Sequence, residues 1–335
     1  MTIHTLNNSN GIKIRIMPLG GIIKELWVPD REGNLADVTL GFDTEEEYLD
    51  NAPYFGAIIG RVGNRIGKST FKLNGADYRL AENDGANHLH GGNVGFNKVN
   101  WEIEPIHDNG NSGLRLSYTS VDGEEGYPGN LTTEVCYCLS EDNELRIRYR
   151  ATTDAPTPVN LTQHAYFNLA GHDSGQVLDH QVMINADFFT PADEFSIPTG
   201  EIRRLDNTPL DFRKPAAIGE RIEQDFEQLR LAKGLDHNFV LNKVPSELSH
   251  AATVSEPNSG RKMDVFTTEP GIQLYTGNYL DEVPGKQGAV YPRRGGLCLE
   301  TQHFPDAPNK PMFPSVILLP GIELRSETIY RFGIC

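Results

Sequence analysis

The 335-residue sequence predicts an all-β protein, a large antiparallel β-sandwich with a few short helices. Three observations predict this class. Apolar and polar residues alternate along several segments, clusters of glycine, asparagine and aspartate separate those segments, and helical periodicity is rare. Alternation with a period of two places apolar side chains on one face of a strand and polar ones on the other. Many short strands joined by glycine-rich turns are typical of sandwiches and barrels.

The alternating segments are expected to form half-buried antiparallel strands. Ile12, Ile14 and Ile16 alternate with basic residues, and residues 114–119 and 145–150 repeat this pattern. Turn-forming clusters separate such segments, at residues 30–34, 73–77, 107–113, 121–130 and 140–144.

Helical patterns are confined to two segments. Apolar residues recur at helical spacing between Pro215 and Arg230, and the proline suits a first helical turn. Residues 43–49 predict one or two turns, because their acidic residues stabilise a helix N-terminus. The sequence has no internal repeat, linker or glycine-rich phosphate loop after a strand. We therefore expect one domain over residues 1–335 rather than a nucleotide-binding architecture.

The charge balance excludes several partners. The chain has 30 Lys+Arg against 46 Asp+Glu, a formal net charge of −16, which disfavours nucleic acid and anionic membranes. No apolar run approaches the roughly 18–20 residues of a membrane span, and the opening residues lack the basic and apolar regions of a secretory signal. We expect a cytoplasmic protein; the sequence does not indicate its oligomeric state.

The four cysteines agree with a reducing compartment. Cys136 and Cys138 lie two apart in an expected strand, so their side chains share one face. A single C-x-C pair is a weak zinc signal, and buried thiols that pack as small apolar groups are the favoured interpretation.

Five segments combine titratable residues with glycine, proline and aromatic residues: 60–67, 87–92, 160–171, 234–239 and 298–309. His164 has apolar and aromatic neighbours and is either a core histidine or a general acid. Glu300 follows an apolar strand segment, where a buried carboxylate needs a partner or a role. Asp236, and Arg65 beside Asn64, complete the polar set.

His88 and His90 lie two residues apart and are expected to share a strand face. This spacing occurs in metal sites, although no carboxylate follows closely here. A histidine that anchors a turn is the second interpretation. Contact with a sugar or another polyol is the favoured one, because Gly91 and Gly92 allow a ligand to approach the backbone.

These segments together resemble the aldose 1-epimerase, or galactose mutarotase, family. The matching motifs are GRVGNRI, NHLHGG, DGEEGYPGNL, NLTQHAYFNLAG, LDHNFVL, GIQLYTGNYL and ETQHFPDAPN, in that order. The resemblance covers nearly the whole chain. It implies a galactose mutarotase-like supersandwich and an isomerase that interconverts the α and β anomers of free aldohexoses such as glucose and galactose, with neither metal nor organic cofactor.

The resemblance implies that His164 is the general acid, Glu300 the general base and His90 an auxiliary histidine near the ring oxygen. The base takes the proton of O1, the acid protonates O5, the open aldehyde rotates about C1–C2, and reclosure gives the other anomer. We expect the nearby carboxylate to raise the pKa of His164. A bell-shaped pH profile that belongs to the pair follows.

The resemblance also implies substrate contacts for Asn64, Arg65, His90, Asp236 and Gln273, and Tyr166 is expected to line the same pocket. The roles of His88, His303 and Asp306 stay open, as does the preferred aldose.

Two alternatives remain. A glycoside hydrolase would need two carboxylates that flank the scissile bond, and a non-catalytic sugar-binding or sensing domain could use the same fold. A phosphorylated hexose is a less natural substrate at this net charge, although Arg61 and Arg65 could form a positive pocket.

Overall fold

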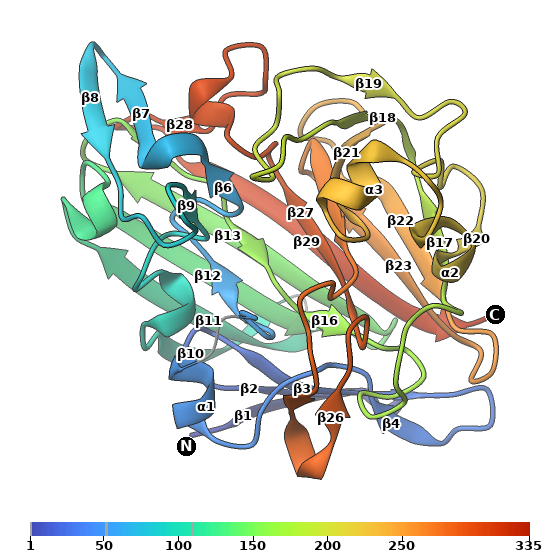
Figure 1. Cartoon of the computed structure of the whole chain (residues 1–335). Coiled ribbons are helices and arrows are strands. Elements are labelled where there is room, and N and C mark those ends of the chain that lie inside the picture. The colour runs from blue at the N-terminus through green and yellow to red at the C-terminus, as the bar shows by residue number, and fades with distance from the viewer. Residues whose placement is uncertain (1, 51–52, 109) are drawn as a thin grey trace.

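The computed structural model describes residues 2–50, 53–108 and 110–335. Within these ranges the strands form three larger antiparallel sheets and five two-stranded ribbons, accompanied by three short α-helices. The predicted all-β class is confirmed. We call the three larger sheets the large sheet, the site sheet and the N-terminal sheet. Figure 1 shows strands β27 and β16 of the site sheet in front of the long strands of the large sheet.

The large sheet contains, in spatial order, β10 (Glu102–Asp108), β11 (Asn111–Ser120), β12 (Leu131–Leu139), β13 (Glu144–Thr153), β29 (Leu324–Ile334), β23 (Arg261–Thr267), β22 (Ser249–Ser255), β17 (Gln181–Ile184) and β20 (Ala216–Ala217). The site sheet contains β16 (Tyr166–Phe167), β27 (Leu297–Gln302), β24 (Gly271–Tyr275), β21 (Asp236–Leu241), β18 (Ala186–Thr190) and β19 (Arg203–Arg204). The N-terminal sheet contains β1 (His4–Asn7), β2 (Lys13–Ile16), β3 (Ile23–Pro29) and β4 (Leu35–Asp37).

The ribbons pair β5 (Ile58–Ile59) with β15 (Thr162–Gln163), β6 (Arg65–Ile66) with β9 (His88–Leu89), β7 (Thr70–Leu73) with β8 (Ala76–Arg79), β14 (Thr157–Pro158) with β28 (Ile317–Leu318), and β25 (Val283–Pro284) with β26 (Val290–Tyr291). The helices are α1 (Glu45–Leu49), α2 (Ile218–Ile222) and α3 (Glu227–Leu231).

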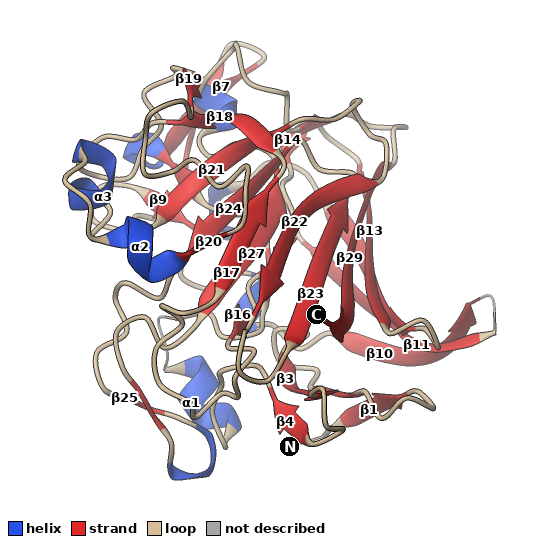
Figure 2. Cartoon of the chain, turned by 90° about the vertical axis from the view of Figure 1, so that its right-hand side faces the viewer, coloured by secondary structure: helices blue, strands red, loops and turns tan. Residues whose placement is uncertain are grey.

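The large sheet and the site sheet lie side by side as two layers, with the N-terminal sheet at the bottom of Figure 2. Side-chain hydrogen bonds join the layers. The Tyr330 hydroxyl of β29 donates to the Leu299 carbonyl of β27 over 3.1 Å, and the hydroxyls of Thr301 and Thr328 are hydrogen-bonded over 2.5 Å. Apolar residues from both sheets fill the space between them, so the fold is a sandwich with one extended core.

The strand predictions are confirmed. Ile14 and Ile16 are buried within β2, and residues 114–119 and 145–150 lie within β11 and β13. The turn predicted over 107–113 is too long, because β10 continues to Asp108 and β11 begins at Asn111; residue 109 lies outside the described residues. Among the described residues, no helix has the length and apolar character to cross a membrane.

The helix predicted over 43–49 is confirmed as α1, which begins with a capping box between Thr44 and Glu47. The single helix predicted from Pro215 to Arg230 is wrong. Two five-residue helices form instead, and Phe226 between them has an extended backbone with φ −143°. This conformation ends the helical run and lets the Phe226 ring pack against the core.

The cysteines are all free. Cys136 and Cys138 do share one face of β12, and Cys138 and Cys298 are buried. The expectation of buried thiols is wrong for Cys335, which is exposed, and Cys136 is half-buried.

Candidate active site

Strand β27 carries Glu300 into the interior of the protein, because both faces of this strand are covered. Leu297 and Leu299 point into the main core, whereas Cys298 packs in a second apolar cluster on the opposite face. Since side chains alternate along a strand, Glu300 projects from the same face as Cys298. Every residue of β27 is buried, so the carboxylate of Glu300 enters an interior space.

Strand register extends this face across the site sheet. One row of directly opposed residues contains Asn238, Gln273 and Glu300, and the next row contains Asp236, Tyr275, Cys298 and Tyr166. Directly opposed residues of antiparallel strands project to the same side. Polar side chains from four strands of different sequence regions therefore converge.

A cavity of about 170 Å³ lies over this face. It is lined by Pro53, Tyr54, Asn64, Arg65, Leu89, His90, His164, Tyr166, Asp236, Tyr275, Tyr279, Leu280 and Glu300. This set includes all predicted site residues except Gln273, whose amide donates to the Asp236 carboxylate over 2.6 Å. Tyr279 is 54% exposed, so the cavity meets solvent at this ring.

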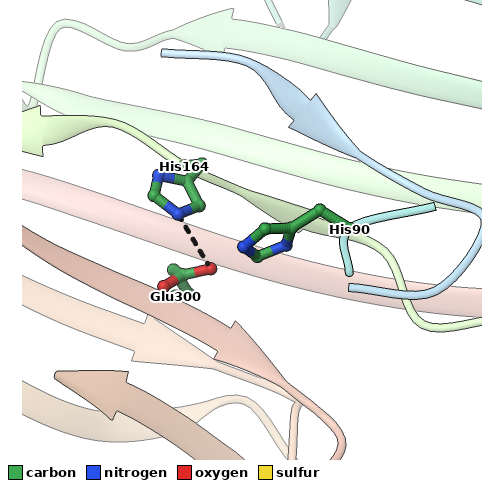
Figure 3. Close-up of side chains that lie close together, drawn as sticks. All are labelled: His90, His164 and Glu300. Atoms are coloured by element: carbon green, nitrogen blue, oxygen red, sulfur yellow. Dashed lines mark ion pairs between the residues drawn. The ribbon is translucent and has the colours of Figure 1, made fainter. Parts of the chain in front are cut away.

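His164 and Glu300 face each other across the cavity (Figure 3). The Nε2 atom of His164 lies 3.6 Å from Oε2 of Glu300, and both side chains are buried. Within the described part of the chain, this Oε2 has no hydrogen-bond partner. A buried carboxylate oxygen without a donor is costly, and a ligand hydroxyl is the kind of group that satisfies it.

Burial shifts the two pKa values in opposite directions. Desolvation lowers the pKa of His164 to about 4. Desolvation, reinforced by the negative charge of Asp236 and opposed by Arg65, raises the pKa of Glu300 well above its ordinary value. The expectation that a neighbouring carboxylate raises the pKa of His164 is therefore wrong, because desolvation on burial lowers it.

His90 does not share a strand face with His88, contrary to the sequence prediction. Strand β9 ends at Leu89, and His90 has a left-handed backbone with φ 51°. The His88 ring turns away from the cavity and contacts the Ala81 carbonyl and the Tyr127 hydroxyl. His90 instead packs against the His164 ring, with 5.0 Å between the ring centroids.

The tautomer of His90 follows from one hydrogen bond. The backbone N–H of Asn64 donates to Nδ1 of His90 over 3.1 Å. A backbone N–H is always a donor, so Nδ1 accepts and the proton of the neutral ring is on Nε2. Desolvation, together with the charges of His164 and Arg65, lowers the pKa of His90 well below its ordinary value, which keeps the ring neutral. His90 therefore offers the cavity an N–H donor.

His90, His164 and Glu300 lie close enough to suggest a metal site, since one potential ligand atom of each falls within 4.8 Å of the others. The donor chemistry does not fit. A metal needs an unprotonated ring nitrogen, and a metal-bound histidine donates its other N–H to an acceptor. In His90 the other nitrogen already accepts from Asn64, so Nε2 keeps its proton and cannot bind a cation.

Arg65 is held between two carboxylates. Its Nε donates to Asp84 over 2.8 Å, and one terminal nitrogen lies 4.0 Å from the Asp236 carboxylate. Desolvation raises the pKa of Asp236, and Arg65 and Gln273 oppose this shift. The remaining guanidinium donors and the Asp236 carboxylate form a polar wall of the cavity, suited to sugar hydroxyls.

Gly91 and Gly92 do not line the cavity, so the expected approach of a ligand to their backbone is wrong. A Cβ at Gly91 would lie 1.8 Å from the Gly60 carbonyl oxygen, and one at Gly92 would meet the Glu125 carboxylate. These glycines allow the chain itself to pack closely. Glu125, from the DGEEGYPGNL motif, accepts hydrogen bonds from two backbone N–H groups that follow Gly92.

Arg61 does not contribute positive charge to the cavity, contrary to the alternative raised from the sequence. Its guanidinium is buried and donates to Ser120 and to the carbonyls of Val121 and Pro128. This arginine instead joins the segment of residues 60–67 to the segment of residues 120–128.

Sequence reasoning missed several residues around the cavity. Tyr54 packs on His90 with 4.7 Å between ring centroids, and its backbone is left-handed with φ 61°. Asp84 follows no motif that distinguishes it from a surface carboxylate. Tyr275 and Tyr279 lie in the GIQLYTGNYL motif, where strand alternation from Gln273 places Tyr275 on the site face.

A β-sandwich with a buried histidine and carboxylate that meet at a polar cavity fits the class of enzymes that move protons on a bound polyol. The family model described as aldose 1-epimerase matches residues 2–331. The chain belongs to the aldose 1-epimerase family, whose members are isomerases.

Curated relatives cover nearly the whole chain. Galactose mutarotase of Bos taurus and that of Homo sapiens are each 48% identical over 327 residues, which is 97% of this chain and 92% of theirs. Aldose 1-epimerase of Escherichia coli (strain K12) is 38% identical over 330 residues, 98% of this chain and 94% of its own. Among solved structures, an aldose epimerase homologue from C. elegans superposes with a TM-score of 0.90 at 32% identity, covering 99% of both chains.

Proposed function

We propose that the protein is an aldose 1-epimerase that interconverts the α and β anomers of free aldohexoses such as glucose and galactose. The observation that carries this proposal is the Oε2 atom of Glu300, which has no hydrogen-bond partner among the described residues and lies 3.6 Å from Nε2 of His164 at a cavity walled by Arg65 and Asp236. An O–H group placed there meets one proton acceptor and one proton donor. The mutarotase and epimerase names of the full-length relatives support the same activity.

In this mechanism the Glu300 carboxylate takes the proton of the anomeric O1 while the His164 imidazolium gives a proton to the ring O5. The C1–O5 bond breaks and the C1–O1 bond becomes a carbonyl. The open aldehyde rotates by about half a turn around C1–C2, and the reverse proton transfers close the ring as the other anomer. Each positioned proton transfer contributes about 10²–10⁴-fold.

The other cavity residues bind and orient the sugar. His90 donates its Nε2–H to the ring oxygen, and Asn64, Arg65 and Asp236 hold the hydroxyls. Gln273 acts behind Asp236, whose carboxylate it fixes. Tyr166 forms an aromatic wall, since its ring centroid lies 5.2 Å from that of His164.

The reaction needs one proton on the acid–base pair. The opposed pKa shifts predict this state between the acid limb, set near the His164 value of about 4, and the alkaline limb, set by the raised pKa of Glu300. The pair therefore gives a bell-shaped kcat/KM profile. Because no hydride, phosphate or carbanion is handled, we propose that the reaction uses no metal or organic cofactor.

We further propose that residues 1–335 act as one domain in the cytoplasm, with a monosaccharide as partner and neither nucleic acid nor membrane. One apolar core that extends from Leu6 to Phe332 supports the single domain, and the net charge of −16 supports the absence of polyanionic partners. The four free cysteines agree with a reducing compartment.

The test is polarimetry of freshly dissolved α-D-glucose, α-D-galactose, xylose and arabinose with the purified protein. We expect acceleration of the approach to anomeric equilibrium, which also ranks the sugars. Monosaccharide release from a disaccharide would favour the glycoside hydrolase, and binding without acceleration would favour the sensing domain.

A further inference from the structure

The side chain of Asn160 lies where three site segments meet. Asn160 is 3% exposed and precedes the acid, His164, by four residues. Its Oδ1 accepts from the backbone N–H of His303 over 2.9 Å, and its Nδ2 donates to the His303 carbonyl over 3.1 Å. His303 follows the base, Glu300, by three residues. The amide therefore joins the segment of the acid to the segment of the base by a two-point contact.

The same residue reaches the segment that carries the arginine. The backbone N–H of Asn160 donates to the Arg61 carbonyl over 2.9 Å, and the Gly63 N–H donates to the Asn160 carbonyl over 2.7 Å. The side-chain Nδ2 also approaches the Gly63 carbonyl, at 3.4 Å. Gly63 lies two residues before Arg65, so this short parallel bridge ties residues 61–63 to the acid segment.

We propose that Asn160 is a positioning residue of the reaction, which sets the spacing between the acid His164 and the base Glu300 by clamping their segments to one another and to residues 61–63. The inference rests on the proposed function. Asn160 does not line the cavity and so acts only through the residues it holds.

A second link supports this arrangement and gives Asp306 a role. The backbone N–H of Asp306 donates to the Arg65 carbonyl over 2.8 Å, and its Oδ1 accepts from the Gly67 N–H over 2.9 Å. Asp306 is 2% exposed, and its Oδ2 pairs with Lys310 over 2.9 Å. The chain that leaves β27 is thus fixed at His303 by Asn160 and at Asp306 by the arginine strand β6.

Spacing matters because the acid and the base must both reach one sugar ring. Proton transfer requires heavy atoms at hydrogen-bond distance, and a displacement of about 1 Å can cost about 10²-fold in rate. The main-chain ladder ties the acid segment to the base strand on one side of the pair, where β16 pairs Tyr166 with Cys298, two residues from His164 and two from Glu300. The Asn160 amide ties the two segments on the other side of the pair, at His303.

The experiment compares Asn160→Ala with the matched control Asn185→Ala. Asn185 is half-buried, and its Nδ2 also donates to two backbone carbonyls, those of Asn242 and His250. It does not line the cavity, and its partners belong to neither the acid segment nor the base segment. Folding is verified by circular dichroism and thermal unfolding, and kcat, KM and the pH profile are measured for galactose and glucose.

We expect Asn160→Ala to lower kcat by about 10²-fold with KM changed less than about threefold, and to shift both limbs of the pH profile. Asn185→Ala should lose thermal stability while its kcat, KM and pH limbs stay those of the wild type. If Asn160→Ala does not fold, Asn160→Ser, which keeps a hydroxyl of smaller reach, is measured instead, and we expect a smaller loss of kcat.

A folded Asn160 variant with wild-type kcat and pH limbs overturns the inference, as does an equal loss of kcat in Asn185→Ala. These outcomes are distinct from failure of the proposed function, in which the wild-type protein itself does not accelerate mutarotation.

Discussion

Replacing Glu300 by glutamine tests the assignment of the base most directly. The carboxylate is buried, lies 3.6 Å from Nε2 of His164, and its Oε2 lacks a hydrogen-bond partner among the described residues. Glutamine has nearly the same shape but cannot take a proton at neutral pH. The substitution therefore removes the proton acceptor while it leaves the cavity walls in place.

The expected loss follows from the value of one positioned proton transfer. A loss of about 10²–10⁴-fold in kcat corresponds to about 2.7 to 5.4 kcal/mol in the barrier. Although the substitution lowers activity, it should increase the free energy of unfolding relative to the wild type at higher pH. The pKa of Glu300 is raised in the folded state, so its contribution is favourable below the unfolded-state pKa and is lost as the pH rises. Glu300→Gln should therefore gain stability relative to the wild type as the pH increases from 5 to 8.

The assay is polarimetric kcat and KM for galactose, with urea midpoints at pH 5 and 8. Glu256→Gln is the matched control, because Glu256 is 2% exposed and lies outside the cavity. Burial opposes its ionisation, but hydrogen bonds from Ser259 and Asn258 hold its pKa below the ordinary value. This control should keep full activity and lose stability at neutral pH. A Glu300→Gln variant within threefold of wild-type kcat would refute the assignment.

Three further outcomes are expected. Asp236→Asn should raise KM about 10- to 150-fold, which corresponds to the loss of one hydrogen bond to a charged group. It should also move the alkaline limb of the pH profile to lower pH, because Asp236 raises the pKa of Glu300. An unchanged KM contradicts this prediction. Removal of metals with EDTA should leave kcat unchanged and added Co²⁺ should produce no ligand-field band, whereas Co²⁺ binding that His90→Ala abolishes would overturn the tautomer argument. The free energy of unfolding, followed by urea midpoints, should fall as the pH drops from 6.5 towards 4. Burial lowers the pKa values of His164, His180 and His237 to about 4, so protonating each one costs about 3 kcal/mol of folding free energy. A urea midpoint that stays constant from pH 7 to 4.5 would contradict this prediction.

The fold class could be predicted from the sequence because strand periodicity is a local signal. The alternation around Ile14, and that of residues 114–119 and 145–150, reports only whether a segment has one buried face. The helix predicted from Pro215 to Arg230 shows the limit of such a signal. Ile218, Ile222 and Leu229 are buried as the helical spacing requires, yet the extended backbone at Phe226 divides the segment.

The site residues that lie in sequence motifs could be predicted, whereas those whose role depends on contacts between distant segments could not. Motif resemblance placed His164, Glu300 and Arg65 together, and the cavity contains all three. No local pattern predicts that the Asn64 N–H fixes the tautomer of His90, because that bond depends on a left-handed turn between distant segments. Tyr54 was missed for the same reason.

The pKa of His164 is lowered by burial, whereas the sequence predicted that it would be raised. This lowered value explains how the pair can work without an acid that is always charged. Desolvation favours the neutral imidazole beside a protonated Glu300, while the mechanism uses the imidazolium beside the carboxylate. These two forms contain the same number of protons and have the same net charge, so they differ only by one proton transfer within the pair. Sugar hydroxyls that enter the cavity solvate the charged form, since they donate to the carboxylate and accept from the imidazolium. The charged form is therefore stabilised by the substrate that uses it, and the free protein avoids the cost of holding two buried charges.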